Sequence, residues 1–203
     1  MESDTCLAIL SGGQSNRFHS NKSLARFHQN PLISHMVELA QKISNSVFVV
    51  VSNDKQKQQI QPLINNIPVV LDSDGYPGCP LTAALAAFTS CEEQFCQLLP
   101  VDTPLLKPPL IELILGLRNN HDAVVPLWPS GYIEPLHSIY KTTSAASKAK
   151  RLLDSQSLKM RDLVNALEDV LFVSVEILKQ VDPSLDSFKN ANTREELLQF
   201  ESF

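Results

Sequence analysis

Residues 5–13 read TCLAILSGG, a mostly apolar run that ends in a serine and two glycines. A continuous apolar run of this length, followed at once by glycines, is typical of a buried β-strand that enters a loop. A second run, VFVVV at 47–51, is β-branched almost throughout. Such runs are typical of strands that are covered on both faces, so the two together favour a sheet between two layers of helices.

The rest of the chain alternates between the two kinds of element. The spacing of apolar residues predicts a helix that opens at Pro31, with Asn30 as its cap, and runs to Ile43. We expect strands at 5–10, 47–51, 67–71, 95–99, 123–126, 137–140 and 170–175, and further helices at 54–64, 81–88, 109–117, 142–154, 158–167 and 194–200. This alternation predicts an α/β fold, a doubly wound, mostly parallel sheet with helices on both faces. Without a repeat or a Gly/Ser/Pro-rich linker, we expect one domain over residues 1–203.

Composition narrows the class of protein. The chain has 203 residues, of which 43% are hydrophobic and 19% charged, as in an ordinary globular protein. Its 17 basic and 22 acidic residues give a net charge of −5, which argues against nucleic acid or an anionic membrane as a partner. No apolar run approaches the roughly 20 residues of a membrane span.

The cysteine pattern contains no C-x-x-C pair, and no histidine stands at a zinc-site spacing from it. We therefore expect four reduced thiols, at Cys6, Cys79, Cys91 and Cys96. Glu2 and Asp4 precede a short apolar run, a pattern unlike that of a secretory signal. Together these features predict a cytoplasmic protein.

Ligands of doubly wound sheets bind beyond the carboxyl ends of the strands. The first such segment holds Gly12 and Gly13, which allow backbone amides to approach an anion. Arg17 and Lys22 follow, and both can hold the outer phosphates of a nucleotide. The pattern is neither a P-loop nor a dinucleotide fingerprint, so a plain turn with two surface cations is an equal alternative.

Two aspartates follow other expected strands. Asp102 stands between two prolines in LLPVDTP at 98–104, where a hard cation that bridges phosphates would be held. Asp72 ends the strand at 67–71 and precedes Gly78, which lies just before a helix. The alternative for each aspartate is a turn or a helix cap.

The C-terminal stretch FKNANTREEL covers 188–197. Thr193 and Glu196 have the spacing of a capping box, which needs no functional explanation. Asn190 and Asn192, just ahead of it, could offer amide groups to a ligand.

His137 lies in EPLHSIY at 134–140, inside a strand pattern. A histidine there could serve as a general base. A satisfied histidine in the core or at its rim is the favoured interpretation.

In this order, the segments resemble the molybdenum cofactor guanylyltransferases over residues 7 to about 200. The resemblance rests on L-x-G-G-x-S-x-R with a lysine five residues on, on P-x-D-T-P, and on N-x-N-T-x-E-E-L, the most specific motif. The glycine-rich opening is shared with many sugar and isoprenoid nucleotidyltransferases. The resemblance implies a Rossmann-like fold of the nucleotide-diphospho-sugar transferase type. It also implies transfer of GMP from GTP to the terminal phosphate of molybdopterin, with release of pyrophosphate.

The resemblance assigns residues to each substrate. Lys22, with Arg17, would stabilise the phosphates, Asp102 would hold the cofactor Mg²⁺, and Asn190 and Asn192 would lie on the pterin side. It further implies GTP and molybdopterin as partners, with other molybdenum-cofactor proteins, and we expect a monomer. The nucleotide-binding residues implied are Leu10, Ser11, Gly12, Gly13, Lys22, Asn53, Asp72 and Asp102.

The chain departs from the family in the loop after Arg17. The family usually reads R-M-G-x-D-K, whereas residues 17–22 read RFHSNK, with His19 in place of the glycine. A nucleotidyltransferase that uses CTP or a sugar or alcohol phosphate is an open alternative. So is a catalytically weak protein that only binds the nucleotide or the cofactor. A nicotinamide dehydrogenase is disfavoured because G-x-G-x-x-G is absent.

Overall fold

The computed structural model describes residues 4–12 and 21–201, in which seven strands form one sheet of order β5-β4-β1-β6-β8-β7-β9. β8 is antiparallel to β6 and β7, and every other pair in this sheet is parallel. The predicted doubly wound, mostly parallel sheet is therefore confirmed. The strands are β1 (Thr5–Leu10), β4 (Val47–Val51), β5 (Val69–Leu71), β6 (Phe95–Pro100), β7 (Ala123–Leu127), β8 (Ile139–Lys141) and β9 (Val170–Ser174).

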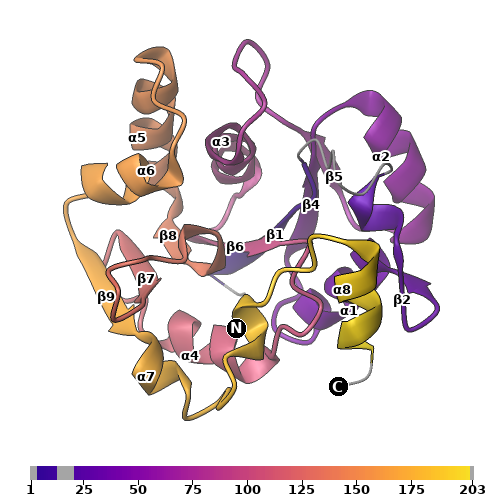
Figure 1. Cartoon of the computed structure of the whole chain (residues 1–203). Helices are drawn as coiled ribbons and strands as arrows, with labels where there is room; N and C mark the ends of the chain where they lie inside the picture. The colour runs from indigo at the N-terminus through magenta and orange to yellow at the C-terminus, as the bar shows by residue number, and fades with distance from the viewer. Residues whose placement is uncertain (1–3, 13–20, 202–203) are drawn as a thin grey trace.

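Helices cover both faces of the sheet (Figure 1). One core contains side chains of α1 (Leu32–Gln41), α2 (Asp54–Ile60), α4 (Pro108–Gly116), α7 (Val175–Leu178) and α8 (Arg194–Phe200). The opposite core contains those of α3 (Pro80–Ser90), α5 (Thr142–Asp154) and α6 (Met160–Ala166). No helix in the described part of the chain is long and apolar enough to cross a membrane.

The central strand β1 explains why its sequence is apolar throughout. Leu7 and Ile9 point into one core, whereas Cys6, Ala8 and Leu10 point into the other. A parallel strand with a helical layer on each face has no polar side, so a continuous apolar run is what the position requires.

The predicted helix cap at Asn30 is wrong. The N-cap of α1 is Pro31, without a side-chain hydrogen bond, because Asn30 instead pairs with Phe27 in a hairpin of β2 (Arg26–Phe27) and β3 (Asn30–Pro31). The hairpin was not predicted from the sequence. Its turn is made by His28 and Gln29 at φ of 45° and 70°, not by the Asn-Gly pair that usually indicates such a turn.

Several element boundaries also differ from expectation, and a proline lies near the two described next. The helix expected over 54–64 ends at Ile60 and continues as a 3-10 turn, η2 (Gln61–Leu63), since Pro62 lacks an amide donor. The strand expected at 137–140 starts only at Ile139, after a second 3-10 turn, η3 (Pro135–His137).

The expectation of four reduced thiols is wrong, because Cys6 and Cys91 form a disulfide with Cα atoms 6.3 Å apart. Cys6 points from β1 toward α3, and Cys91 is the residue at which α3 ends. Packing of this helix on the sheet brings the two residues together although 85 positions separate them. No local spacing could reveal such a pair. Cys79 and Cys96 are free thiols.

We predict that alkylation of the denatured protein without reductant labels only Cys79 and Cys96. Prior reduction should expose all four thiols. Replacing Cys6 and Cys91 by serine should lower the free energy of unfolding by about 2–4 kcal/mol, because the unfolded chain gains conformational freedom. Cys79→Ser, which leaves the disulfide intact, is the control in chemical denaturation. Four labelled cysteines without reductant would contradict the disulfide.

Candidate functional site

The carboxyl ends of β1 and its parallel neighbours meet at one edge of the sheet. The Ser11 amide, just past β1, donates to the Val50 carbonyl of β4 at 2.8 Å. The Val101 amide, just past β6, donates to the Leu10 carbonyl at 3.1 Å. The loops in which the sequence predicts ligand-binding residues are therefore anchored side by side.

Gly12 allows two of these loops to approach each other closely. A β-carbon at Gly12 would lie 2.8 Å from Oγ of Ser52 and 3.6 Å from Oδ2 of Asp72. A larger residue would force the Ser52 hydroxyl to move, so glycine is the residue that fits this approach without rearrangement. Gly13, Arg17 and His19 lie outside the described residues.

Asp72 is a half-buried carboxylate that no described residue neutralises. Its Oδ1 is buried and accepts no hydrogen bond from the described chain. Burial raises the pKa of Asp72 to about 6. The N-cap of α3 is Cys79, so Asp72 does not serve as the helix cap that was its alternative role. It borders a cavity of about 170 Å³, lined by Ser52, Asp72, Ser73, Asp74, Gly75, Tyr76, Gly78 and Thr82.

Lys22 and Asp102 form an ion pair at this edge, with Nζ 2.8 Å from Oδ2. Their side chains are only 14% and 25% exposed. Lys22 opens a 3-10 turn whose N-cap is Asn21, and Asp102 follows β6. Asp102 does not cap α4 either, because the cap of that helix is Lys107. The structure thus brings together the two residues that the sequence assigned to phosphates and metal.

The surroundings of Asp102 fit a magnesium ion. A carboxylate that is partly open and already 2.8 Å from an ammonium group can accept a hard cation in its place. Mg²⁺ usually takes one or two protein carboxylates and keeps several waters. His137 adds no competing positive charge, since burial lowers its pKa to about 4, although the Asp102 carboxylate opposes this shift.

Gln56 connects two of the loops and was missed in the sequence. Its Oε1 accepts from the Ser52 amide and its Nε2 donates to the Ser11 carbonyl, both at 2.9 Å. Asn53 caps α2, because its Oδ1 accepts from the Gln56 amide at 3.0 Å. An N-cap residue followed three positions later by glutamine is the capping-box spacing, and that signal could have identified Gln56.

The C-terminal segment crosses the same edge of the sheet. The Ala191 amide donates to the Asp102 carbonyl at 2.8 Å, so the exposed Asn190 and Asn192 flank a residue that is bound to Asp102. The predicted cap of α8 is confirmed, since Thr193 Oγ1 accepts from the Glu196 amide at 3.1 Å.

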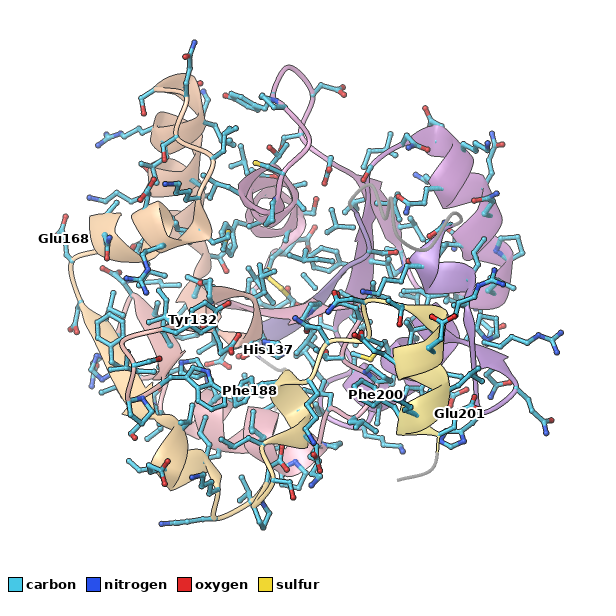
Figure 2. The ribbon with its side chains drawn as sticks, in the orientation of Figure 1. Tyr132, His137, Glu168, Phe188, Phe200 and Glu201 are labelled. Carbon is cyan, nitrogen blue, oxygen red and sulfur yellow. A yellow bond between two sulfur atoms is a disulfide. The ribbon has the colours of Figure 1, made fainter. Side chains whose placement is uncertain are left out.

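His137 is buried, as expected. Its ring packs edge-on against Phe188 with centroids 5.1 Å apart, and Figure 2 shows the two side by side. The ring nitrogens have no described partner in ideal hydrogen-bond geometry, but the Ser187 backbone lies close enough to act on the ring and favour its protonated form, and the Glu134 carboxylate lies 3.8 Å from Nδ1. The Tyr140 hydroxyl donates to the Pro135 carbonyl at 2.7 Å, so a hydrogen bond joins the two ends of the stretch 134–140.

We predict that Asp72→Asn stabilises the protein at pH 8 but not at pH 4. The folded pKa of about 6 exceeds the ordinary value of 3.8, so the folded state holds the proton more tightly. Stability is therefore lost as pH rises between these two values. After allowance for solvent screening, the gain at pH 8 should be about 1 kcal/mol in urea denaturation. Asp74→Asn, on the exposed part of the same loop, is the control. An equal gain at both pH values would contradict the prediction.

Comparison with known proteins places the chain in a family. Residues 7–170 match the model of the MobA-like NTP transferase domain. A probable molybdenum cofactor guanylyltransferase of Methanosarcina mazei is 25% identical over 195 residues, covering 93% of this chain and 86% of that protein. One from Bacillus cereus is 29% identical over 193 residues, covering 94% and 92%.

Solved structures share the fold. Molybdopterin-guanine dinucleotide biosynthesis protein A from Archaeoglobus fulgidus has a TM-score of 0.83 at 24% identity, covering 97% of this chain and 96% of that one. A CMP:2-keto-3-deoxy-manno-octonic acid synthetase complexed with CTP has a TM-score of 0.72 at 15% identity, covering 98% of each chain. The family match extends over most of the sequence, and the chain is thus a nucleotidyltransferase that belongs to the MobA-like NTP transferase domain family.

Proposed function

We propose that this nucleotidyltransferase transfers GMP from GTP to the terminal phosphate of molybdopterin. The observation that carries the proposal is the placement of Asp102 between Lys22 and the C-terminal segment. Its carboxylate contacts Lys22, and its carbonyl accepts from the segment that holds Asn190 and Asn192. One residue therefore adjoins both the expected phosphate site and the expected acceptor site. The relatives named as probable molybdenum cofactor guanylyltransferases support the choice of substrates.

The reaction needs alignment more than proton transfer. An oxygen of the acceptor phosphate bonds to the α-phosphorus of GTP, while the bond from that phosphorus to the oxygen bridging to the β-phosphorus breaks. The electron pair leaves with pyrophosphate. Because the attacking phosphate is already an anion, no general base is required. The chain contributes by holding both substrates in line and by neutralising their charge.

Lys22 would meet the outer phosphates and stabilise the departing pyrophosphate, with Arg17 as its predicted partner. Asp102 would hold Mg²⁺, which supplies Lewis-acid polarisation of the α-phosphoryl group. Asn190 and Asn192 would donate to the pterin and orient its phosphate. Of the nucleotide-side predictions, Leu10, Ser11 and Gly12 fix the loop backbone, and Asn53 acts on it through Gln56.

Asp72 supports GTP over CTP. The Watson-Crick edge of guanine presents two adjacent N–H donors, which suit a carboxylate with an unused acceptor. Cytosine presents one amino donor beside two acceptors, and these would face the Asp72 carboxylate with like partial charge. An unsatisfied buried acceptor is costly, so a base that donates to it is favoured.

The cytoplasmic location also belongs to this proposal, because GTP is a cytoplasmic substrate. Because Cys6 and Cys91 form a disulfide, the cysteines no longer favour a cytoplasmic location. The monomeric state and contacts with other molybdenum-cofactor proteins stay predictions.

A thermal-shift panel of GTP, CTP, ATP and UTP, each with and without Mg²⁺, tests the proposal. GTP with Mg²⁺ should give the largest rise in melting temperature, since ligand that binds only the folded state stabilises it. Asp102→Asn should abolish the magnesium-dependent part and lower turnover at least tenfold. A larger rise with CTP would favour the cytidylyl alternative. Binding of GTP by the wild-type protein without turnover of molybdopterin would favour the carrier alternative.

Lys22→Ala should weaken the binding of GTP far more than that of GMP in calorimetry. The ammonium group contacts Asp102, where the outer phosphates are expected, and GMP lacks those phosphates. Lys55→Ala, which removes a similar charge from the exposed surface of α2, is the control. Equal losses for both nucleotides would assign Lys22 to the base or to the fold.

A further inference from the structure

Lys107 forms a second ion pair, away from the Lys22–Asp102 pair. Its Nζ lies 2.7 Å from Oδ1 of Asp182 and 3.5 Å from Oδ2 of Asp186. Lys107 is the N-cap of α4, and Asp182 lies in the turn that follows α7. The Asp182 side chain is 0% exposed. A buried carboxylate is tolerated only when charge and hydrogen bonds compensate for its lost hydration. Burial of Asp182 therefore depends on its contact with Lys107.

Two hydrogen bonds from backbone amides to side chains support this ion pair. The Lys107 amide donates to Oγ of Ser187 at 3.0 Å, and the Ser187 amide donates to Oδ2 of Asp182 at 2.8 Å. Burial alone would raise the pKa of Asp182, but the hydrogen bonds from Lys107 and Ser187 outweigh it and lower that pKa. We call Lys107, Asp182 and Ser187 the C-terminal latch.

The latch acts on the segment that crosses Asp102. Lys107 belongs to the loop that begins with Asp102 after β6. Ser187 precedes Ala191, whose amide is bound to the Asp102 carbonyl at 2.8 Å. The chain from Ser187 to Ala191 is thus attached at both ends to the loop from Asp102 to Lys107. Phe188, within this segment, packs edge-on against the rings of Trp128 and His137, with centroids 5.9 and 5.1 Å away. Figure 2 shows Phe188 beside His137.

We propose that Lys107 and Asp182 are positioning residues for the acceptor substrate. By fixing Ser187, they hold Asn190 and Asn192 at the distance from Asp102 that the acceptor phosphate requires. The assignment of these asparagines to the acceptor rests on the proposed function, whereas the latch itself does not. Neither Lys107 nor Asp182 lines the cavity beside Asp72 or contacts the Lys22–Asp102 ion pair, so we expect loss of the latch to affect nucleotide binding much less than acceptor binding.

The double variant Lys107→Met/Asp182→Asn tests this role, because it removes the ion pair of the latch without leaving the buried charge of Asp182 unpaired. We expect its affinity for GTP with Mg²⁺ to stay within twofold of wild type. The KM for molybdopterin should rise at least fivefold, with a smaller fall in kcat. Amide hydrogen exchange of residues 186–192 should become at least fivefold faster. Lys179→Met/Glu176→Gln, which breaks an exposed pair of the same 2.7 Å length on α7, is the matched control.

Single variants separate positioning from folding. Lys107→Met leaves the Asp182 charge unpaired, so it should unfold at lower denaturant concentration, and the double variant should recover most of that loss. Recovery of stability without recovery of the acceptor KM supports the latch. Ser187→Ala keeps both charges and should raise the acceptor KM more mildly, a test that holds if the double variant does not fold.

A wild-type acceptor KM together with wild-type exchange in either the double variant or Ser187→Ala would overturn the inference. A wild-type protein that makes no product from GTP and molybdopterin would instead overturn the proposed function. In that case faster exchange of 186–192 in the double variant, against an unchanged control, would still establish the latch.

Discussion

The parallel pairing of β1 with β4 on one side and β6 on the other is the constraint on which the rest of the structure depends. Leu10 pairs with Val50 and with Pro100, so the three strands end at the same level. The segment that follows each strand then leaves the sheet at that edge, where the first residues outside the sheet lie close together. Because β5 extends the parallel pairing beyond β4, residues far apart in the sequence such as Gly12 and Asp72 become neighbours, and Asp102 follows β6 at the same edge. The interior of β1 has no polar role, and its apolar sequence serves only to hold this register.

The two aspartates at this edge are in different electrostatic environments. Asp102 has a cation at 2.8 Å and keeps part of its hydration. Asp72 is held in a site where burial raises its pKa to about 6 and no described cation compensates. A carboxylate of the first kind suits a hard metal ion, which could in turn bind phosphates. One of the second kind suits neutral N–H donors, because these satisfy it without bringing a second charge. A net charge of −5 therefore does not prevent the binding of a polyanion, since the local field differs from the average.

Sequence patterns predicted what depends on periodicity and on strand ends. The runs at 5–10 and 47–51 gave the correct strands and faces, and the rule for loops after strands located Gly12, Asp72 and Asp102. Contacts made across the fold could not be found in this way. The Cys6–Cys91 disulfide needs the packing of α3 on the sheet. The hairpin at 26–31 uses a turn of His28 and Gln29 that has no strong sequence signal. The buried surroundings of the His137 ring depend on how Phe188 and Glu134 pack around it.

The residues assigned to the nucleotide precede residue 170, and those assigned to the acceptor follow it. Residues 7–170, which match the family model, contain every side chain that we assign to the nucleotide. The residues assigned to the acceptor, and most of the latch, come after it. A nucleotide site made from strand ends is fixed by the sheet itself and needs little support. The proposed acceptor side belongs to the segment that follows the last strand, β9, and returns across Asp102 largely outside the sheet. Such a loop has no sheet register to fix it, so it needs side-chain contacts of its own. Asp182 supplies such contacts, because its ion pair with Lys107 and its hydrogen bond from Ser187 are directional. Apolar packing alone would restrict the position of the segment less.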